Sequence, residues 1–311
     1  MKPPLIVLTG PTAVGKTKAS IGLARAIGGE IISADSMQIY KYMDIGSAKI
    51  RQSEMEGIPH YLVDELEPDE EFHVVRFQQM AKEAMKKIYA NGHVPILVGG
   101  TGFYIQALLY DIDFKCSEGE PDYRRELEQF AREHGAEKLH ARLQKIDPKA
   151  ASEIHANNVK RVIRAIEYYH QTGECISKHN EAERRKESPY EFRYFVLNDE
   201  RSHLYARIDR RVDQMMEEGL LEEVIGLRER GYTRNMVSMQ GLGYKELFAY
   251  LEGEITLEEA VYIIKRDTRH FAKRQITWFK REKDVIWIDK KHYGYDEAVI
   301  LQAMRNQIPF V

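Results

Sequence analysis

The stretch LIVLTGPTAVGKT, residues 5–17, decides the fold class of this chain. Residues 5–8 are a short apolar run of the kind expected for a buried parallel strand. Residues 10–17 follow at once and match the phosphate-loop pattern G-x4-G-K-[ST] in full. Apolar residues then recur at helical spacing over residues 16–26. A strand, a glycine loop and a helix in this order predict the first unit of a phosphate-loop α/β core.

Strands and helices alternate outward from this unit. Residues 30–34 and 94–98 read as two more buried strands, with a helix over residues 74–91 between them. Such alternation with short connections predicts a three-layer α/β core with a parallel sheet. Gly10, Asp35 and Gly99 each follow a strand end, and parallel sheets bind ligands at the carboxyl ends of their strands. We therefore expect these three positions to converge on one crevice.

The character of the sequence changes between residues 114 and 191. Strand-like runs disappear there, and charged segments with helical patterning replace them at residues 123–134, 137–145 and 158–171, before a polar stretch at 180–188. Strand character returns at residues 192–197, and a late strand is expected at 285–288. We predict a core made of residues 1–113 and 192–311, with residues 114–191 forming a helical insertion domain.

Composition excludes several classes of protein. The chain has 311 residues, a net charge of −3 and two cysteines, Cys116 and Cys175, too few for a disulfide framework or a four-cysteine zinc site. We find neither a secretory signal pattern nor an apolar run of membrane-spanning length. These features predict a cytoplasmic protein without a membrane partner, and we take a monomer as the default.

The net charge hides a strongly basic segment. Residues 265–283 contain eight Lys and Arg residues and two acidic residues. A partner responds to the local field rather than to the total charge. A solvated charged face is the commoner explanation of one basic helix, but an excess of six positive charges in an acidic chain favours an RNA contact.

The phosphate loop has a defined chemistry. Its glycines allow a concave nest of backbone N–H donors, to which the following helix adds its positive end. Lys16 supplies a cation for phosphate oxygens, and Thr17 supplies a hydroxyl that can bind Mg²⁺. The predicted phosphate-binding residues are Gly10, Pro11, Thr12, Ala13, Val14, Gly15, Lys16 and Thr17.

The loop alone does not identify the reaction. The [NT]-K-x-D guanine motif is absent, and the third strand ends in glycines where an ATPase often places an aspartate. The phosphate ligand therefore need not be ATP.

Five further segments carry a resemblance to a known family. They are Ser33–Tyr40 (SADSMQIY), Met43–Lys49 (MDIGSAK), Gly99–Tyr104 (GGTGFY), Gln240–Glu246 (QGLGYKE) and Ala272–Trp278 (AKRQITW). Together with the phosphate loop, they resemble the tRNA dimethylallyltransferases of the bacterial type, over most of the chain from about Leu5 to Trp287. The departures are small, with Val14 where the family often has Ser and Ser47 where it often has Thr.

The resemblance implies a reaction and a partner. Dimethylallyl diphosphate would donate its dimethylallyl group to N6 of the adenosine at tRNA position 37, in the anticodon stem-loop. The phosphate loop would hold the prenyl diphosphate. Thr17 and the diphosphate together lead us to expect Mg²⁺ as cofactor, with Thr17 as its only assigned protein ligand. By the same resemblance, Asp35 would be the general base, Lys16 and Arg211 would stabilise the leaving diphosphate, and Thr101 would lie near the reacting amine or phosphate.

Other assignments concern tRNA. The target base must leave its stack to reach such a crevice. The residues that match tRNA-contacting positions of the family are Asp35, Ser36, Met37, Gln38, Thr101, Lys160, Arg161, Arg164, Gln240, Gly243, Tyr244, Lys245, Lys273, Arg274, Gln275, Trp278 and Lys280.

Three alternatives stay open at this point. A prenyltransferase acting on a free adenine nucleotide would share the loop but would need neither the insertion nor the basic segment. A small-molecule kinase would share the loop and an acidic base, and would consume ATP. A phosphate-loop RNA-binding protein would bind the stem-loop without turnover.

Overall fold

The computed structural model describes residues 2–114 and 121–310. Cys116 therefore lies outside the described residues, as do the other residues of the predicted insertion between 115 and 120. The chain divides into two compact units, one of residues 1–109 with 189–311 and one of residues 110–188. The sequence predicted an insertion of residues 114–191. In the structure the helical unit begins directly after a helix that ends at Leu109 and ends before a strand that begins at Glu191.

The first unit is built on a parallel sheet of six strands in the order β3-β2-β4-β1-β5-β6. The strands are β1 (Pro4–Thr9), β2 (Gly29–Ser33), β3 (His60–Tyr61), β4 (Val94–Gly99), β5 (Glu191–Asn198) and β6 (Val285–Asp289). The pairings between neighbouring strands are all parallel. The predicted α/β fold with a parallel sheet is thus confirmed.

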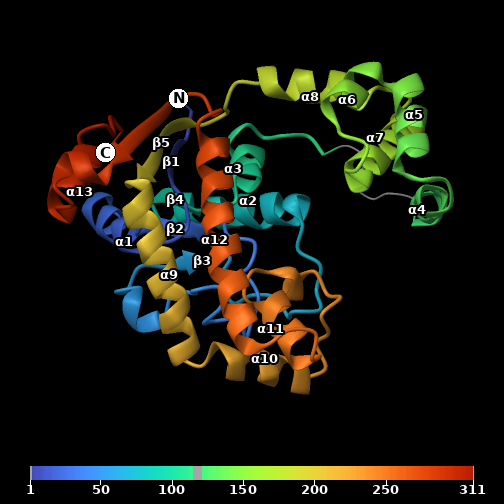
Figure 1. Ribbon diagram of the computed structural model, residues 1–311. Helices are drawn as coiled ribbons and strands as arrows, with labels where there is room; N and C mark the ends of the chain where they lie inside the picture. Colours follow the sequence, from blue (N-terminus) through green and yellow to red (C-terminus); the bar gives the residue numbers. More distant parts are fainter. Residues whose placement is uncertain (1, 115–120, 311) are drawn as a thin grey trace. The chain divides into compact units, whose positions relative to one another are not determined.

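Helices cover both faces of this sheet (Figure 1). Ile6 and Leu8 of β1 belong to the core beneath α1, whereas Leu5 and Val7 are equally inaccessible on the other face. This double burial is the reason that β1 is apolar throughout rather than alternating. The helices of this unit are α1 (Lys16–Ile27), α2 (Val74–Ala90), α3 (Gly102–Leu109), α9 (Arg201–Glu217), α10 (Leu220–Glu229), α11 (Tyr244–Leu251), α12 (Leu257–Phe279) and α13 (Glu297–Arg305).

The long helix α12 runs beside α9 and also packs on α3 and α11 (Figure 1). Thr256 caps its N-terminus by accepting a hydrogen bond from the Glu259 N–H, in a complete capping box. Ile264, Phe271 and Trp278 recur at every seventh residue of α12; Ile264 is 3% exposed, whereas Phe271 and Trp278 are half-buried.

The end of the sheet where the strands begin is held by a buried carboxylate. Glu30 is 1% exposed and accepts hydrogen bonds from Tyr61 Oη (2.6 Å), Asn91 Nδ2 (3.0 Å) and His93 Nδ1 (2.5 Å). Burial opposes ionisation of Glu30, but these bonds outweigh it and leave its pKa below the ordinary value. The cluster links β2, β3 and the turn before β4.

The second unit is helical and has its own core. Its helices are α4 (Pro121–His134), α5 (Ala136–Ile146), α6 (Pro148–Glu153), α7 (Val159–Thr172) and α8 (Ile176–Arg185). Leu127, Leu139 and Val162 are each fully buried in this core. The sequence predicted only a polar stretch at residues 180–188, but α8 extends to residue 185. Its last residue, Arg185, pairs with Glu181 one turn earlier.

No helix within the described residues is long and apolar enough to cross a bilayer. The cytoplasmic location stays a prediction.

Candidate functional site

The phosphate loop connects β1 to α1, as the motif predicts. Lys16 begins the helix, and its ammonium reaches back to donate to the carbonyls of Gly10 (3.0 Å) and Pro11 (2.9 Å). Gly15 caps the helix in the left-handed region, with φ of 98°. The loop therefore places a cation and the helix N-terminus together, which is the arrangement that binds phosphates.

Asp35, Lys16 and Arg211 form one electrostatic cluster. Burial lowers the pKa of Lys16 to about 8, while the charge of Asp35 raises it and that of Arg211 lowers it. Burial likewise lowers the pKa of Arg211, which Asp35 raises and Arg207 lowers further. Three residues that are far apart in the sequence thus share one field at the end of the sheet where β1 and β2 finish.

Local hydrogen bonds aim the Asp35 carboxylate. Its Oδ1 accepts from the backbone N–H of Met37 at 2.9 Å, which fixes the carboxylate just after β2. The preceding residue, Ala34, accepts the N–H of Thr101 at 3.2 Å. The predicted base and the predicted threonine therefore lie on adjacent loops that are bonded to each other.

Thr101 also begins α3, because its carbonyl accepts the N–H groups of Tyr104 (2.9 Å) and Ile105 (3.2 Å). Its backbone thus has a structural role in the glycine turn, and the predicted role of its side chain stays a prediction.

Helix α12 ties the two loops together through Gln275. The side-chain Oε1 accepts from the Thr12 N–H at 2.8 Å, and Nε2 donates to the Gly100 carbonyl at 3.0 Å. Gln275 is 6% exposed. The sequence assigned Gln275 to tRNA binding, whereas the structure commits both ends of its amide to the protein, as a bridge between the phosphate loop and the glycine turn.

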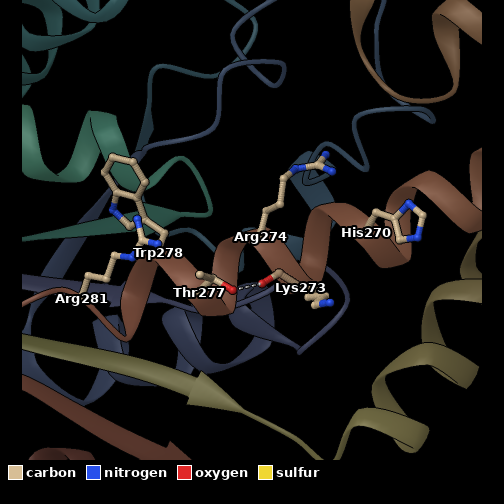
Figure 2. Close-up of a pocket in the computed structure, with 6 residues that line it drawn as sticks. All are labelled: His270, Lys273, Arg274, Thr277, Trp278 and Arg281. Atoms are coloured by element: carbon tan, nitrogen blue, oxygen red, sulfur yellow. Dashed lines mark hydrogen bonds between the residues drawn. The ribbon is translucent and has the colours of Figure 1, made fainter. Parts of the chain in front are cut away.

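A groove opens along α12, the helix that carries Gln275, and Figure 2 draws the residues that line it. It has a volume of about 460 Å³ and is lined by His270, Lys273, Arg274, Thr277, Trp278 and Arg281. Figure 2 shows Trp278 and Arg281 near one end of the row and His270 at the other. A groove with several cations and an aromatic ring has the chemistry of a site for nucleic acid.

Trp278 forms the wall of the groove toward the glycine turn. Its indole lies so close to Gly102 that a Cβ built there would be 2.3 Å from two of its ring atoms. The edge of Phe103 also meets the indole, with ring centroids 6.4 Å apart. The glycine turn that carries Thr101 therefore packs directly against the Trp278 wall of the groove.

The basic excess of residues 265–283 is partly cancelled, which corrects the expectation from the sequence. Lys265 pairs with Asp213 (2.5 Å) and Arg269 pairs with Asp209, both on α9. The count of charges within the segment missed these acidic partners because they come from another helix. Within the part of the chain that the structure describes, five cations of the segment form no ion pair, namely Lys273, Arg274, Lys280, Arg281 and Lys283.

Gln38 is held in one orientation by the protein. Its Nε2 donates to the carbonyls of Ser47 (3.4 Å) and Ala48 (3.2 Å), and its Oε1 accepts from Ser33 Oγ at 3.2 Å. Gln38 is half-exposed, as are Ser36 and Met37 beside it. These three predicted tRNA contacts remain accessible next to Asp35.

Sequence reasoning missed Glu223, which clamps the segment that holds Gln38. The carboxylate accepts the consecutive N–H groups of Asp44 (2.8 Å), Ile45 (2.7 Å) and Gly46 (3.1 Å). It also accepts the Tyr244 hydroxyl at 2.7 Å. A single acidic residue in the first turn of α10 forms no recognisable motif, so sequence analysis could not identify its role.

The Gln240–Glu246 motif lies against this clamp. Tyr244 is 1% exposed and packs on Gly46, so its side chain is placed inside the protein and not at a surface for tRNA. Gly243 caps α11, with φ of 96°. Lys245 is near Glu246 (3.3 Å), and the exposed Gln240 donates to the Arg234 carbonyl.

The insertion carries three predicted tRNA contacts on α7. Lys160 and Arg161 are exposed and Arg164 is half-buried. Their contact with tRNA stays a prediction.

Thr17 lies exposed in the first turn of α1. The described residues contain no cluster of three or more His, Cys, Asp or Glu side chains that could hold a metal ion. A hydroxyl beside a phosphate loop fits Mg²⁺, provided that phosphate and water oxygens complete the coordination.

The chain matches the family model of IPP transferase over residues 38–282. The tRNA dimethylallyltransferase of Lachnoclostridium phytofermentans is 63% identical over 302 residues, covering 97% of this chain and 96% of the relative. That of Acetivibrio thermocellus is 52% identical, with 95% of each chain covered.

Solved structures agree. The tRNA delta(2)-isopentenylpyrophosphate transferase of Staphylococcus epidermidis is 44% identical, with a TM-score of 0.73 and 99% of each chain covered. A eukaryotic dimethylallyltransferase acting on tRNA is 31% identical, with a TM-score of 0.80 over 92% of this chain and 74% of the other. The chain belongs to the IPP transferase family, the group of the tRNA dimethylallyltransferases.

Proposed function

We propose that this enzyme transfers a dimethylallyl group from dimethylallyl diphosphate to N6 of the adenosine at position 37 of tRNA. The observation that carries the proposal is that the charges of Asp35, Lys16 and Arg211 act on one another beside the phosphate loop. It places an acceptor for a proton next to cations that suit a leaving diphosphate.

The diphosphate side of the reaction uses positive charge. The bond between the allylic carbon and the diphosphate oxygen breaks, and negative charge grows on that oxygen. Lys16, Arg211 and the N–H groups of the loop are fixed donors for it. Removing one such preorganised donor costs about 3–4 kcal/mol of transition-state stabilisation.

The acceptor side needs a base. The exocyclic amine of adenosine is a weak nucleophile, and its proton leaves as the new carbon–nitrogen bond forms. Asp35 accepts this proton, while the Met37 N–H holds the other carboxylate oxygen. A positioned general base contributes about 10²–10⁴-fold to the rate.

Mg²⁺ fits as the cofactor of this reaction. Thr17 would hold it together with diphosphate oxygens, and the ion would neutralise charge on the leaving group.

The groove on α12 suits the anticodon loop. Unpaired bases bind RNA-binding proteins by stacking on aromatic rings, with cations along the backbone. Trp278 offers the ring, and Lys273, Arg274 and Arg281 offer the cations. A free adenine nucleotide would not need this row of cations, which favours tRNA as the acceptor. We also propose that the enzyme acts as a monomer, since a single chain contains all these residues, and that it is cytoplasmic.

The test uses unmodified tRNA with adenosine at position 37, labelled dimethylallyl diphosphate and Mg²⁺, with adenosine monophosphate as a competing acceptor. We expect label in tRNA only, and none in a tRNA with guanosine at position 37. Asp35→Asn keeps an oxygen for the Met37 N–H and removes the base, so the rate should fall at least about 100-fold. Asp69→Asn, at an exposed position, is the matched control.

Two results would contradict the proposal. Label in the free nucleotide alone would assign the enzyme to the nucleotide prenyltransferases. Consumption of ATP without any prenyl transfer would indicate a kinase.

A further inference from the structure

A buried lysine lies behind the phosphate loop, outside every motif discussed above. Lys290 follows β6, in the short helix of residues 290–293, and is 8% exposed. Its Nζ donates to the Val14 carbonyl at 3.3 Å. The side chain thus reaches from the far edge of the sheet to the loop that binds phosphates.

This contact controls a peptide group of the loop. In a trans peptide, the carbonyl and the next N–H point in opposite directions. By holding the Val14 carbonyl, Lys290 therefore directs the Gly15 N–H away from itself. Gly15 has φ of 98°. Because glycine has no Cβ, sterics alone do not fix the orientation of the peptide between Val14 and Gly15. The hydrogen bond from Lys290 favours one orientation.

Lys290 also adds charge to this side of the loop. A Cβ built on Gly15 would lie 3.3 Å from Lys290 Nζ and 3.6 Å from a terminal nitrogen of Arg207. Burial lowers the pKa of Lys290, and Arg207 lowers it further, while Glu297 and Asp199 oppose these effects.

Lysine is rarely buried without an ionic partner. No acidic side chain among the described residues forms an ion pair with Lys290. An apolar side chain of similar length would fill the space without the cost of burying a charge. The ammonium is therefore retained at a cost, next to a loop whose ligand is an anion.

We propose that Lys290 is a positioning residue for the prenyl diphosphate, which orients the Gly15 N–H through the Val14 carbonyl and supplies a fixed positive charge behind the loop. This inference rests on the proposed function, because it assumes that the loop binds dimethylallyl diphosphate.

The test compares four variants by calorimetric titration with dimethylallyl diphosphate and Mg²⁺ in the absence of tRNA. Lys290→Met removes the donor and the charge, and should weaken binding about 10- to 100-fold, as expected for the loss of a hydrogen bond to a charged group. Lys290→Gln keeps a donor and loses the charge, so its affinity should lie between. Lys290→Arg keeps both and should be closest to wild type.

Lys291→Met is the matched control, because Lys291 is exposed and pairs with Glu200. It should bind the donor as wild type does, and none of the variants should change the affinity for tRNA. An effect on the Michaelis constant for the donor, with that for tRNA unchanged, separates positioning from a general loss of structure.

Several results would overturn the inference. Equal donor affinity in Lys290→Met and Lys291→Met would do so, as would an equal loss of tRNA and donor affinity. If Lys290→Met does not fold, tighter binding of dimethylallyl diphosphate by the Gln variant than by the Arg variant would also overturn the inference.

The wild-type protein distinguishes this inference from the proposed function. If it binds inorganic diphosphate but not dimethylallyl diphosphate, the prenyl donor is wrong, and the same variants then test Lys290 with diphosphate as the probe.

Discussion

Replacing Glu223 with alanine should loosen the segment of residues 44–46 and weaken the use of tRNA. The change removes the shared acceptor of three backbone N–H groups and of the Tyr244 hydroxyl. Because residues 47 and 48 supply the carbonyls that hold Gln38, the effect should reach the side chain beside Asp35.

The size of the effect follows from the number of bonds. A hydrogen bond contributes about 1 kcal/mol net, and one to a charged group contributes about 1.5–3 kcal/mol. Glu223 is half-exposed, so water can replace part of the loss. We expect a decrease of about 2–4 kcal/mol in the free energy of unfolding, and a fall of several degrees or more in Tm.

Thermal unfolding followed by circular dichroism measures the stability, and hydrogen exchange reports the N–H groups of residues 44–46 directly. The specificity constant for tRNA should fall more than that for dimethylallyl diphosphate. Glu222→Ala, one residue away and exposed, should change neither quantity. If the two alanine variants unfold at the same temperature with the same exchange rates, the clamp does not stabilise this segment.

Two further predictions concern Glu30 and Gly102. The folded-state pKa of Glu30 is lowered, so its contribution to stability is present above its ordinary pKa of 4.5 and disappears as the pH falls below it. Glu30→Gln should therefore lower the free energy of unfolding by about 1–3 kcal/mol at pH 7 and much less at acid pH, as measured by denaturant titration; an equal loss at both pH values would refute the ionic contribution. Gly102→Ala forces a Cβ into the Trp278 indole and should cost about 1–3 kcal/mol. In a double-mutant cycle, adding Trp278→Leu should relieve most of this cost, and simple additivity would show that the two side chains do not collide.

The core of the fold could be predicted from the sequence because its signals are local. A buried parallel strand is apolar throughout, and the phosphate loop has a fixed spacing, so β1, α1 and β4 were placed within one or two residues. Strand β3 has only two residues and was missed. So short a pairing exists because β2 offers an open edge, which no local pattern records.

The candidate site was less predictable, because a residue type does not reveal whether its side chain points into the protein or toward its surface. Tyr244 and Gln275 stand in family motifs as polar or aromatic residues suited to RNA, yet the structure turns both inward. Lys290 and Glu223 could not be identified from the sequence because neither belongs to a motif. Each acts on backbone groups of a distant loop, and such a contact needs only one ordinary charged residue at one position.

Helix α12 shows why the inward residues matter as much as the exposed ones. Gln275 and Trp278 are three residues apart, so they lie on neighbouring turns of one rigid helix. Gln275 fixes that helix to the phosphate loop and to the glycine turn, and Trp278 forms the wall of the groove. Because both belong to the same helix, a nucleotide bound in the groove as we propose would be held relative to the phosphate loop by this helix and not by flexible segments. If tRNA and the prenyl diphosphate bind as proposed, the geometry between acceptor and donor would be set before either binds, which is where a transfer reaction gains most from preorganisation.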